Sequence, residues 1–283
     1  MFRTLIDPQT LSSHLSDSWV LMDCRCQLGS DIYGREAYAR SRIPGARFAH
    51  LENDLSGEII RGKTGRHPLP TPEAFSRKLG NWGITAHTQV VAYDDAGGAY
   101  ASRLWWMLNW LGHPKVAVLD GGWQAWNALA LPLDSSPLSG EERMPGADAC
   151  FSAVPYEDLL IQTEELISRQ AEITLIDARG ANRYAGQDET IDPVAGHIPG
   201  ALSYPFMENL SPRGVFLSPE ALRARFHALK DKKVVSSCGS GVTACHNILA
   251  MVHAGLPMPK LYPGSWSEWI TDPTRPITTG SEP

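Results

Sequence analysis

The sequence contains the same series of short motifs twice, and this repeat limits the possible folds more than any other feature. The first half contains VLMDCRCQ (20–27), SRIPGARF (41–48), VVAYDD (90–95) and LDGGWQAW (119–126), and the second half contains, in the same order, TLIDARGA (174–181), GHIPGALS (196–203), VVSSCG (234–239) and YPGSWSEW (262–269). Corresponding residues such as Asp23 and Asp177 are separated by the length of a typical domain. The repeat therefore indicates duplication of a whole domain and excludes a short solenoid repeat.

The repeat and the local composition together predict the domain boundaries. A segment rich in Ser, Pro, Gly and charged residues separates the two series of motifs, and this composition is typical of a linker. We predict a first domain at residues 1–135, a linker at 136–151 and a second domain at 152–283. The 283 residues of the chain are enough for two domains of ordinary size.

Within each half, short apolar runs alternate with longer segments of helical periodicity. The apolar runs are WVLMD, QVVAYD and KVAVLD in the first half and ITLID, KVVSS and KLYPG in the second, and the helical patterns include SRLWWMLNWLG (102–112) and PEALRARFHALK (219–230). This alternation predicts an α/β fold in which each domain is a mainly parallel sheet flanked by helices. The tryptophans Trp105, Trp106 and Trp110 have helical spacing and are expected in the core.

Composition excludes several classes of function. The net charge of −6 and the absence of a basic stripe argue against nucleic-acid binding. No run of about 18 apolar residues and no signal-peptide pattern is found, so we expect no membrane association and a cytoplasmic protein. The five cysteines are an odd number without zinc-site spacing, which favours reduced thiols. Cys24 and Cys26 are expected to be structural, and no disulfide is expected between them.

The duplication also provides an internal control, because features present in both halves are expected to serve the fold. These features are the pairs Asp23/Asp177 and Arg25/Arg179, the two IPGA turns, and the tryptophans Trp123/Trp126 and Trp266/Trp269. Features present in one half are candidates for function. Cys238 is such a feature, since the first half has Asp94 and Asp95 after the corresponding VV strand.

Cys238 is expected at the carboxyl end of a strand, where the turn GSG leads into a helix that begins at about Val242. Glycines allow such a turn to point successive backbone N–H groups at one atom, and the helix amino terminus favours an anion at the same place. The sulfur would therefore be held partly as a thiolate nucleophile. Cysteine phosphatases place an arginine six residues after the cysteine, but that position is Ala244 here, which argues against phosphoryl transfer. Cys245 is expected to be buried and inert.

The duplicated GHIPGA-type turns, the loop CGSGVTA and the closing YPGSWSEW resemble the two-domain rhodanese-type sulfurtransferases, most closely the 3-mercaptopyruvate sulfurtransferases. The resemblance implies a catalytic second rhodanese-like domain, a non-catalytic first one, and a persulfide on Cys238. It also implies substrate contacts from the loop residues Gly239, Gly241, Val242 and Thr243, a small anionic sulfur donor, and a small thiol, a thioredoxin-like protein or cyanide as acceptor. No metal or organic cofactor is implied. The alternatives are thiosulfate as the donor and a non-catalytic sulfur-carrier or binding module.

The resemblance further implies that Arg183 binds the carboxylate of the donor. Mercaptopyruvate enzymes usually have a second arginine before GHIPG, but this chain has QDETIDPVA there, without an arginine. The first half contains a longer loop, GEIIRGKTGRHPL (57–69). Its basic residues Arg61, Lys63 and Arg66 are candidates to reach the donor site. For Arg61 and Lys63 the alternative is that they belong to a solvated loop.

The histidine of that loop has a separate implied role. Family members place a histidine near this point to relay a proton through the loop serine, which corresponds to His67 and Ser240 here. Either Glu52 or Asp54 corresponds to the acid that pairs with the histidine, and the sequence leaves that choice open.

Overall fold

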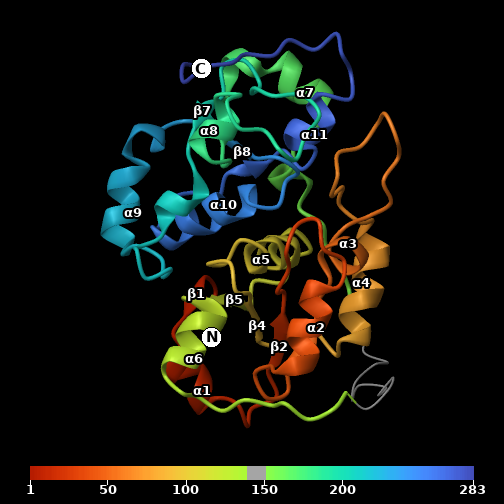
Figure 1. Ribbon diagram of the computed structural model, residues 1–283, viewed down its shortest axis with the longest axis vertical. Coiled ribbons are helices and arrows are strands. Elements are labelled where there is room, and N and C mark those ends of the chain that lie inside the picture. Colours follow the sequence, from red (N-terminus) through yellow and green to blue (C-terminus); the bar gives the residue numbers. More distant parts are fainter. Residues whose placement is uncertain (139–150) are drawn as a thin grey trace. The chain divides into compact units, whose positions relative to one another are not determined.

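The computed structural model describes residues 1–138 and 151–283, so most of the predicted linker at 136–151 lies outside the described residues (Figure 1). The chain divides into two compact units. Unit 1 comprises Met1–Gly57 and Pro70–Tyr156, and unit 2 comprises Glu58–Leu69 and Glu157–Pro283. The segment Glu58–Leu69 thus belongs to unit 2, although it lies within the predicted first domain. The placement of the domain boundaries at 1–135 and 152–283 stays a prediction.

Unit 1 is built on a parallel sheet. Among the described residues its strands are β1 (Leu5–Ile6), β2 (Val20–Asp23), β3 (Arg47–Phe48), β4 (Val90–Tyr93) and β5 (Val116–Leu119), in the spatial order β1-β5-β4-β2-β3. Strands β4 and β5 are buried along their whole length, as expected for strands covered on both faces. The short β1 and β3 at the edges were not among the apolar runs picked out by the sequence.

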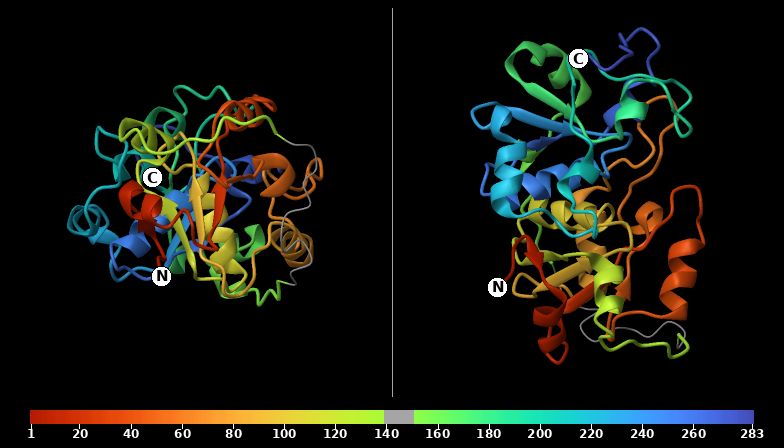
Figure 2. Two further views of the ribbon diagram at one scale, coloured as in Figure 1. Left: turned by 90° about the horizontal axis from the view of Figure 1, so that it is seen from below. Right: turned by 60° about the vertical axis from the view of Figure 1, so that its left-hand side comes forward.

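The helices of unit 1 flank this sheet (Figures 1 and 2). They are α1 (Pro8–Ser13), α2 (Tyr33–Arg40), α3 (Leu51–Asp54), α4 (Pro72–Asn81), α5 (Ala101–Trp110) and α6 (Gly122–Ala128). The start of α4 is fixed by Thr71, whose hydroxyl accepts the N–H of Ala74, with Pro72 at the first helical position. The three tryptophans of α5 are buried, which confirms their predicted place in the core.

Unit 2 repeats the sheet of unit 1. Its strands are β6 (Thr174–Asp177), β7 (Leu202–Ser203), β8 (Val234–Ser237) and β9 (Lys260–Leu261), all parallel, in the order β7-β6-β8-β9. This order matches β3-β2-β4-β5. A single parallel bridge between Leu160 and Leu261 stands in the place that β1 occupies in unit 1. The predicted α/β architecture of two tandem domains with mainly parallel sheets is confirmed.

One helix of unit 2 is shorter than the sequence pattern predicts, and short helical elements alternate with the strands of this unit. The α-helices are α7 (Thr163–Ser168), α8 (Ala181–Tyr184), α9 (Pro219–Arg225), α10 (Ala244–His253) and α11 (Ser265–Trp269), and the 3₁₀ turns are η1 (Glu157–Leu159), η2 (Gln170–Glu172), η3 (Phe206–Asn209) and η4 (His227–Leu229). The pattern at 219–230 predicted one helix, but α9 ends at Arg225 and η4 follows. Phe226 and Leu229 are both buried, and a spacing of three places them on one face of a 3₁₀ turn.

A buried ion pair follows the equivalent strand in each unit. Arg25 donates from Nε and Nη2 to the carboxylate of Asp23, and Arg179 does the same to Asp177. The guanidinium of Arg25 lies 4.1 Å from the ring centroid of Trp123. In unit 2, Arg179 lies 5.0 Å from the ring centroid of Trp266. The repeated geometry agrees with the expectation that these residues serve the fold.

The turn after β4 is occupied by its own carboxylate. Asp94 is fully buried and accepts the backbone N–H groups of Ala96, Gly98, Tyr100 and Ala101 at 2.8–2.9 Å. Four converging N–H donors form a concave site that stabilises a negative charge. The same turn in unit 2 carries Cys238 at the equivalent place.

None of the helices in the described parts of the chain is long and apolar enough to cross a membrane. The described cysteines Cys24, Cys26, Cys238 and Cys245 are unpaired with one another, whereas Cys150 lies outside the described residues.

We predict that Asp94→Ala lowers the free energy of unfolding of unit 1 by roughly 2 to 4 kcal/mol, because buried N–H groups lose their acceptor. Asp95→Ala is the matched control. Asp95 accepts a hydrogen bond from Tyr33, and its loss should cost less than about 1 kcal/mol. Urea unfolding monitored by circular dichroism measures both variants, and equal losses would contradict the structural importance of the Asp94 carboxylate.

Candidate active site

Cys238 directly follows β8 and is held by the segment that leads into α11. Cys238 is only 2% exposed. Its backbone N–H donates to the hydroxyl of Ser265 at 3.0 Å, and its carbonyl accepts the N–H of Trp266 at 3.0 Å. The carbonyl of Gly239 accepts the N–H of Ser267 at 2.8 Å. The motif SWSEW therefore fixes the backbone of the cysteine turn, a role that the sequence did not reveal for Ser265 or Ser267.

The turn itself requires glycine at position 241. Gly241 has a φ of +74°, which L side chains rarely adopt, and an added Cβ would overlap the carbonyl oxygen of Pro263. The turn leads into α10, which begins at Ala244 with Thr243 as its N-cap residue, two positions later than the predicted start at Val242. As predicted for an inert thiol, Cys245 is buried, and its Sγ donates to the carbonyl of Gly241 at 3.3 Å.

The backbone of this turn has donors without acceptors. Within the described residues, no hydrogen bond uses the N–H groups of Gly239, Ser240, Val242 or Thr243. In unit 1 the corresponding turn directs its N–H groups at the carboxylate of Asp94. The comparison indicates that the turn after β8 is suited to an anion that the chain itself does not supply.

The segment Glu58–Leu69, which is the orange loop beside α11 in Figure 1, brings a histidine to this turn. The N–H of Arg66 donates to the hydroxyl of Ser267 at 3.1 Å, and a Cβ at Gly65 would lie 2.7 Å from the carbonyl of Gly264, so the segment packs closely here. His67 is 5% exposed, and its Nδ1 lies 2.7 Å from the Oγ of Ser240. The structure thus places together the two residues that the sequence paired.

The outer part of the same segment has a different environment. Arg61 and Lys63 are exposed, which corresponds to the solvated alternative considered for them.

Two arginines face the cysteine turn. A side chain at Gly239 would lie 3.0 Å from Nη2 of Arg66 and 3.5 Å from Nη2 of Arg183. Both residues were predicted from the sequence, and the structure brings them together although they are far apart in the chain. Burial lowers the pKa of Arg66.

Two carboxylates that the sequence reasoning missed hold these arginines. Glu189 accepts from Nε and Nη2 of Arg183, and Asp192 accepts from both Arg183 and Arg66. Their side chains are each 2% exposed. The sequence signal for them is the acidic composition of QDETIDPVA, a segment without an arginine.

The two candidate acids for His67, Glu52 and Asp54, lie in unit 1 at α3. Glu52 forms an ion pair with Nδ1 of His50 at 3.0 Å. Asp54 accepts the backbone N–H of His50 at 2.7 Å and pairs with Lys78. Either acid as a partner of His67 stays a prediction.

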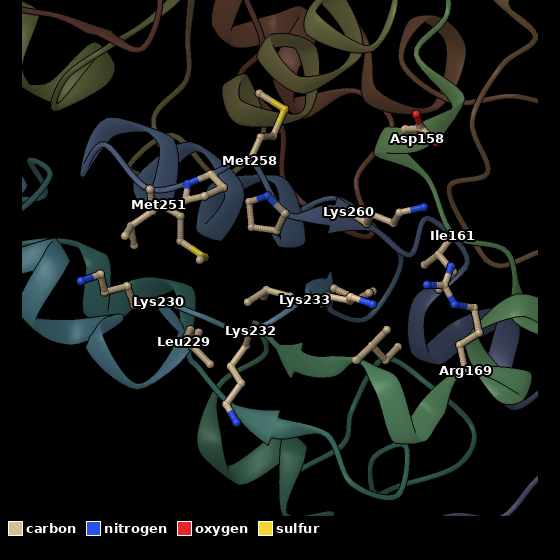
Figure 3. A pocket seen from close by; sticks show the side chains of 16 residues that line it. Asp158, Ile161, Arg169, Leu229, Lys230, Lys232, Lys233, Met251, Met258 and Lys260 are labelled. Carbon is tan, nitrogen blue, oxygen red and sulfur yellow. The ribbon is translucent and has the colours of Figure 1, made fainter.

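A separate hollow of about 310 Å³ lies beside the amino-terminal end of β8 in unit 2 (Figure 3). Its lining includes Lys232 and Lys233, which directly precede β8, and Lys260 of β9. Cys238 follows the carboxyl end of β8 and does not line this hollow.

Comparison with known proteins identifies the class. The Rhodanese-like domain model matches residues 7–129 and 162–272. The chain is 48% identical over 284 residues, 98% of each chain, to a probable 3-mercaptopyruvate sulfurtransferase of Pseudomonas aeruginosa. It is 37% identical to a putative thiosulfate sulfurtransferase of Mycobacterium tuberculosis, over 92% of this chain and 91% of the relative. The structure of 3-mercaptopyruvate sulfurtransferase from Leishmania major superposes with a TM-score of 0.84 at 33% identity, covering 94% of this chain and 74% of the other.

The chain therefore belongs to the rhodanese family, as a two-domain member. Within that family it is a sulfurtransferase, as its similarity to sulfurtransferases over nearly its whole length indicates.

We predict that Gly241→Ala abolishes most of the sulfurtransferase activity, because the turn must move to relieve the overlap with Pro263. Gly214→Ala is the matched control, since Gly214 has a similar φ of +73° but open space around it. Both variants should lose about 1 kcal/mol of stability from backbone strain. Only Gly241→Ala should lose activity in a steady-state assay, and full activity of this variant would show that the turn geometry is not required.

Proposed function

We propose that this chain takes sulfur from 3-mercaptopyruvate, releases pyruvate, and passes the sulfur through a Cys238 persulfide to a thiol acceptor or cyanide. The observation that carries this proposal is the turn after β8, in which the backbone N–H groups of Gly239, Ser240, Val242 and Thr243 have no acceptor among the described residues. The similarity to enzymes named for 3-mercaptopyruvate supports the choice of donor.

In the first half-reaction the Cys238 thiolate attacks the thiol sulfur of 3-mercaptopyruvate. A sulfur–sulfur bond forms, the carbon–sulfur bond of the donor breaks, and its electron pair leaves as the enolate of pyruvate. The outer sulfur of the persulfide carries negative charge. The N–H groups of the turn and the amino terminus of α10 then stabilise this charge where it develops.

His67 and Ser240 transfer the proton in this scheme. The donor thiol loses its proton and the methylene carbon of the enolate gains one, so the step needs a proton carrier between them. The 2.7 Å contact between Nδ1 of His67 and Oγ of Ser240 provides a path from the buried imidazole to the cysteine turn. The histidine accordingly acts as a general acid and base through the serine.

The donor carboxylate is bound by Arg183 and Arg66. Both guanidinium groups face Gly239, next to the nucleophile, and each has N–H groups left over after its contacts with Asp192 and Glu189. A carboxylate between them places the donor sulfur near Cys238. The loop residues Gly239, Gly241, Val242 and Thr243 complete the binding site.

In the second half-reaction an acceptor thiolate or cyanide attacks the outer sulfur and regenerates the Cys238 thiolate. A small thiol or a thioredoxin-like protein fits this chemistry, and neither a metal nor an organic cofactor takes part in it. Unit 1 is the non-catalytic domain, because its turn is filled by Asp94. The free cysteines and the thiol acceptor suit the reducing cytoplasm.

Thiosulfate is the competing donor, because several relatives are named for it. A non-catalytic carrier function is less well supported, since a binding module has no need of an intact cysteine turn.

We predict that Cys238→Ser abolishes sulfur transfer with either donor, because the hydroxyl is a much weaker nucleophile than a thiolate. Intact-protein mass spectrometry after incubation with 3-mercaptopyruvate should show one added sulfur atom on the wild type, removable by dithiothreitol, and none on the variant. Cys245→Ser is the control and should keep the added sulfur. Turnover by Cys238→Ser would exclude the persulfide mechanism.

We further predict that kcat/KM of the wild type is higher for 3-mercaptopyruvate than for thiosulfate. His67→Gln should lower kcat with 3-mercaptopyruvate by roughly 10²-fold or more, because the enolate must be protonated. Thiosulfate releases sulfite, which needs no such proton, so its kcat should change less. A higher kcat/KM for thiosulfate in the wild type would reverse the order of donors, and equal losses with both donors would remove the proton role of His67.

A further inference from the structure

The arginines of the proposed donor site are held by two buried carboxylates. Glu189 and Asp192 lie between β6 and β7 in sequence, in the segment that follows α8. Both side chains are 2% exposed, so their charges are removed from water, and such carboxylates are retained only when paired. Their partners are Arg183 and Arg66, which face the cysteine turn, and Arg179, which pairs with Glu189.

We propose that Asp192 and Glu189 set the charge of the donor site, so that it accepts a donor with one negative charge and discriminates against a dianion. This inference rests on the proposed function, in which Cys238 is the nucleophile and Arg183 and Arg66 bind the donor. It adds two specificity-determining residues and a physical reason for the choice between 3-mercaptopyruvate, a monocarboxylate, and thiosulfate, a dianion.

The charges around the donor site balance one another. Three guanidinium groups, those of Arg66, Arg179 and Arg183, are ion-paired with three carboxylates in one connected network. The third carboxylate is Asp177, the structural partner of Arg179. Without Glu189 and Asp192 the site would present two uncompensated positive charges. With them the network is formally neutral, and the remaining attraction for an anion comes from local N–H donors.

Hydrogen bonds to the two carboxylates use only some of the N–H groups of Arg183 and Arg66. Arg183 uses Nε and Nη2 for the two carboxylates, and Arg66 uses Nη1 for Asp192. Among the described residues, Nη1 of Arg183 and Nη2 of Arg66 have no hydrogen-bond partner. A side chain at Gly239 would lie 3.7 Å from the first of these atoms and 3.0 Å from the second. Each arginine therefore keeps an unpaired N–H group beside Gly239, the residue that follows Cys238.

The charge of one carboxylate should change the binding of an anionic donor strongly. A unit charge at about 5 Å in a partly buried site changes the binding of another unit charge by a factor of ten or more. A dianion experiences twice the change that a monoanion experiences. Removing one carboxylate should therefore improve kcat/KM for thiosulfate relative to 3-mercaptopyruvate by about tenfold.

The test uses Asp192→Asn and Glu189→Gln, which remove the charge and keep the shape. Each should raise the ratio of kcat/KM for thiosulfate to that for 3-mercaptopyruvate by about tenfold. Asp192→Glu restores the charge and should return the ratio to that of the wild type. Glu165→Gln is the matched control, because Glu165 also pairs with an arginine, Arg169, on α7 and away from the cysteine turn. Its ratio should not change.

A second measurement does not depend on turnover. Iodoacetate and iodoacetamide both alkylate a thiolate with loss of iodide, but only iodoacetate carries a negative charge. The ratio of their rates at the Cys238 peptide, followed by mass spectrometry, should rise about tenfold in Asp192→Asn and in Glu189→Gln and stay constant in Glu165→Gln.

Failure of this inference can be distinguished from failure of the proposed function. If neither ratio moves in Asp192→Asn or Glu189→Gln, or if both donors lose kcat/KM equally, the charge-setting role is overturned even when the wild type uses 3-mercaptopyruvate. If the wild type forms no persulfide but the alkylation ratio moves as expected, the charge-setting role stands and the proposed function fails. If one variant does not fold, the other still decides.

Discussion

The turn after β8 depends on one backbone constraint, the positive φ of Gly241 against the carbonyl of Pro263. This constraint keeps the chain curled, so that the N–H groups of four neighbouring residues remain available. The segment leading into α11 holds the turn from the other side, since Ser265 accepts the N–H of Cys238. Cys238 can therefore be nearly buried and still lie in a turn suited to negative charge.

The duplicated unit shows what this turn does when it is not used for chemistry. In unit 1 the carboxylate of Asp94 satisfies four N–H groups, and in unit 2 the same place is held by a cysteine. A side-chain carboxylate and a persulfide anion are similar in charge and in distance from the backbone. An aspartate in place of the cysteine thus gives a turn whose backbone N–H groups are hydrogen-bonded to its own side chain.

Sequence reasoning reached much of the site and failed at identifiable points. It identified Cys238, Ser240, His67, Arg183 and Arg66, and the structure places these side chains around one turn of unit 2. It missed Glu189 and Asp192, because acidic residues in a loop are usually solvated and nothing in the local pattern shows that these two are buried beside arginines. It also extended the helix of 219–230 too far, because helical periodicity alone does not reveal a change to a 3₁₀ turn.

The sequence by itself determined the two-domain α/β architecture and the position of the candidate nucleophile. These properties follow from local patterns, namely the repeated motifs, the apolar runs and the glycine turn, and local patterns can be read without knowing which residues meet. Only the tertiary structure decided that Glu58–Leu69 belongs to unit 2 and that Asp192 bridges Arg66 and Arg183. These contacts join residues far apart in the chain, and their partners are selected by burial and charge pairing in the folded state, which no local pattern encodes.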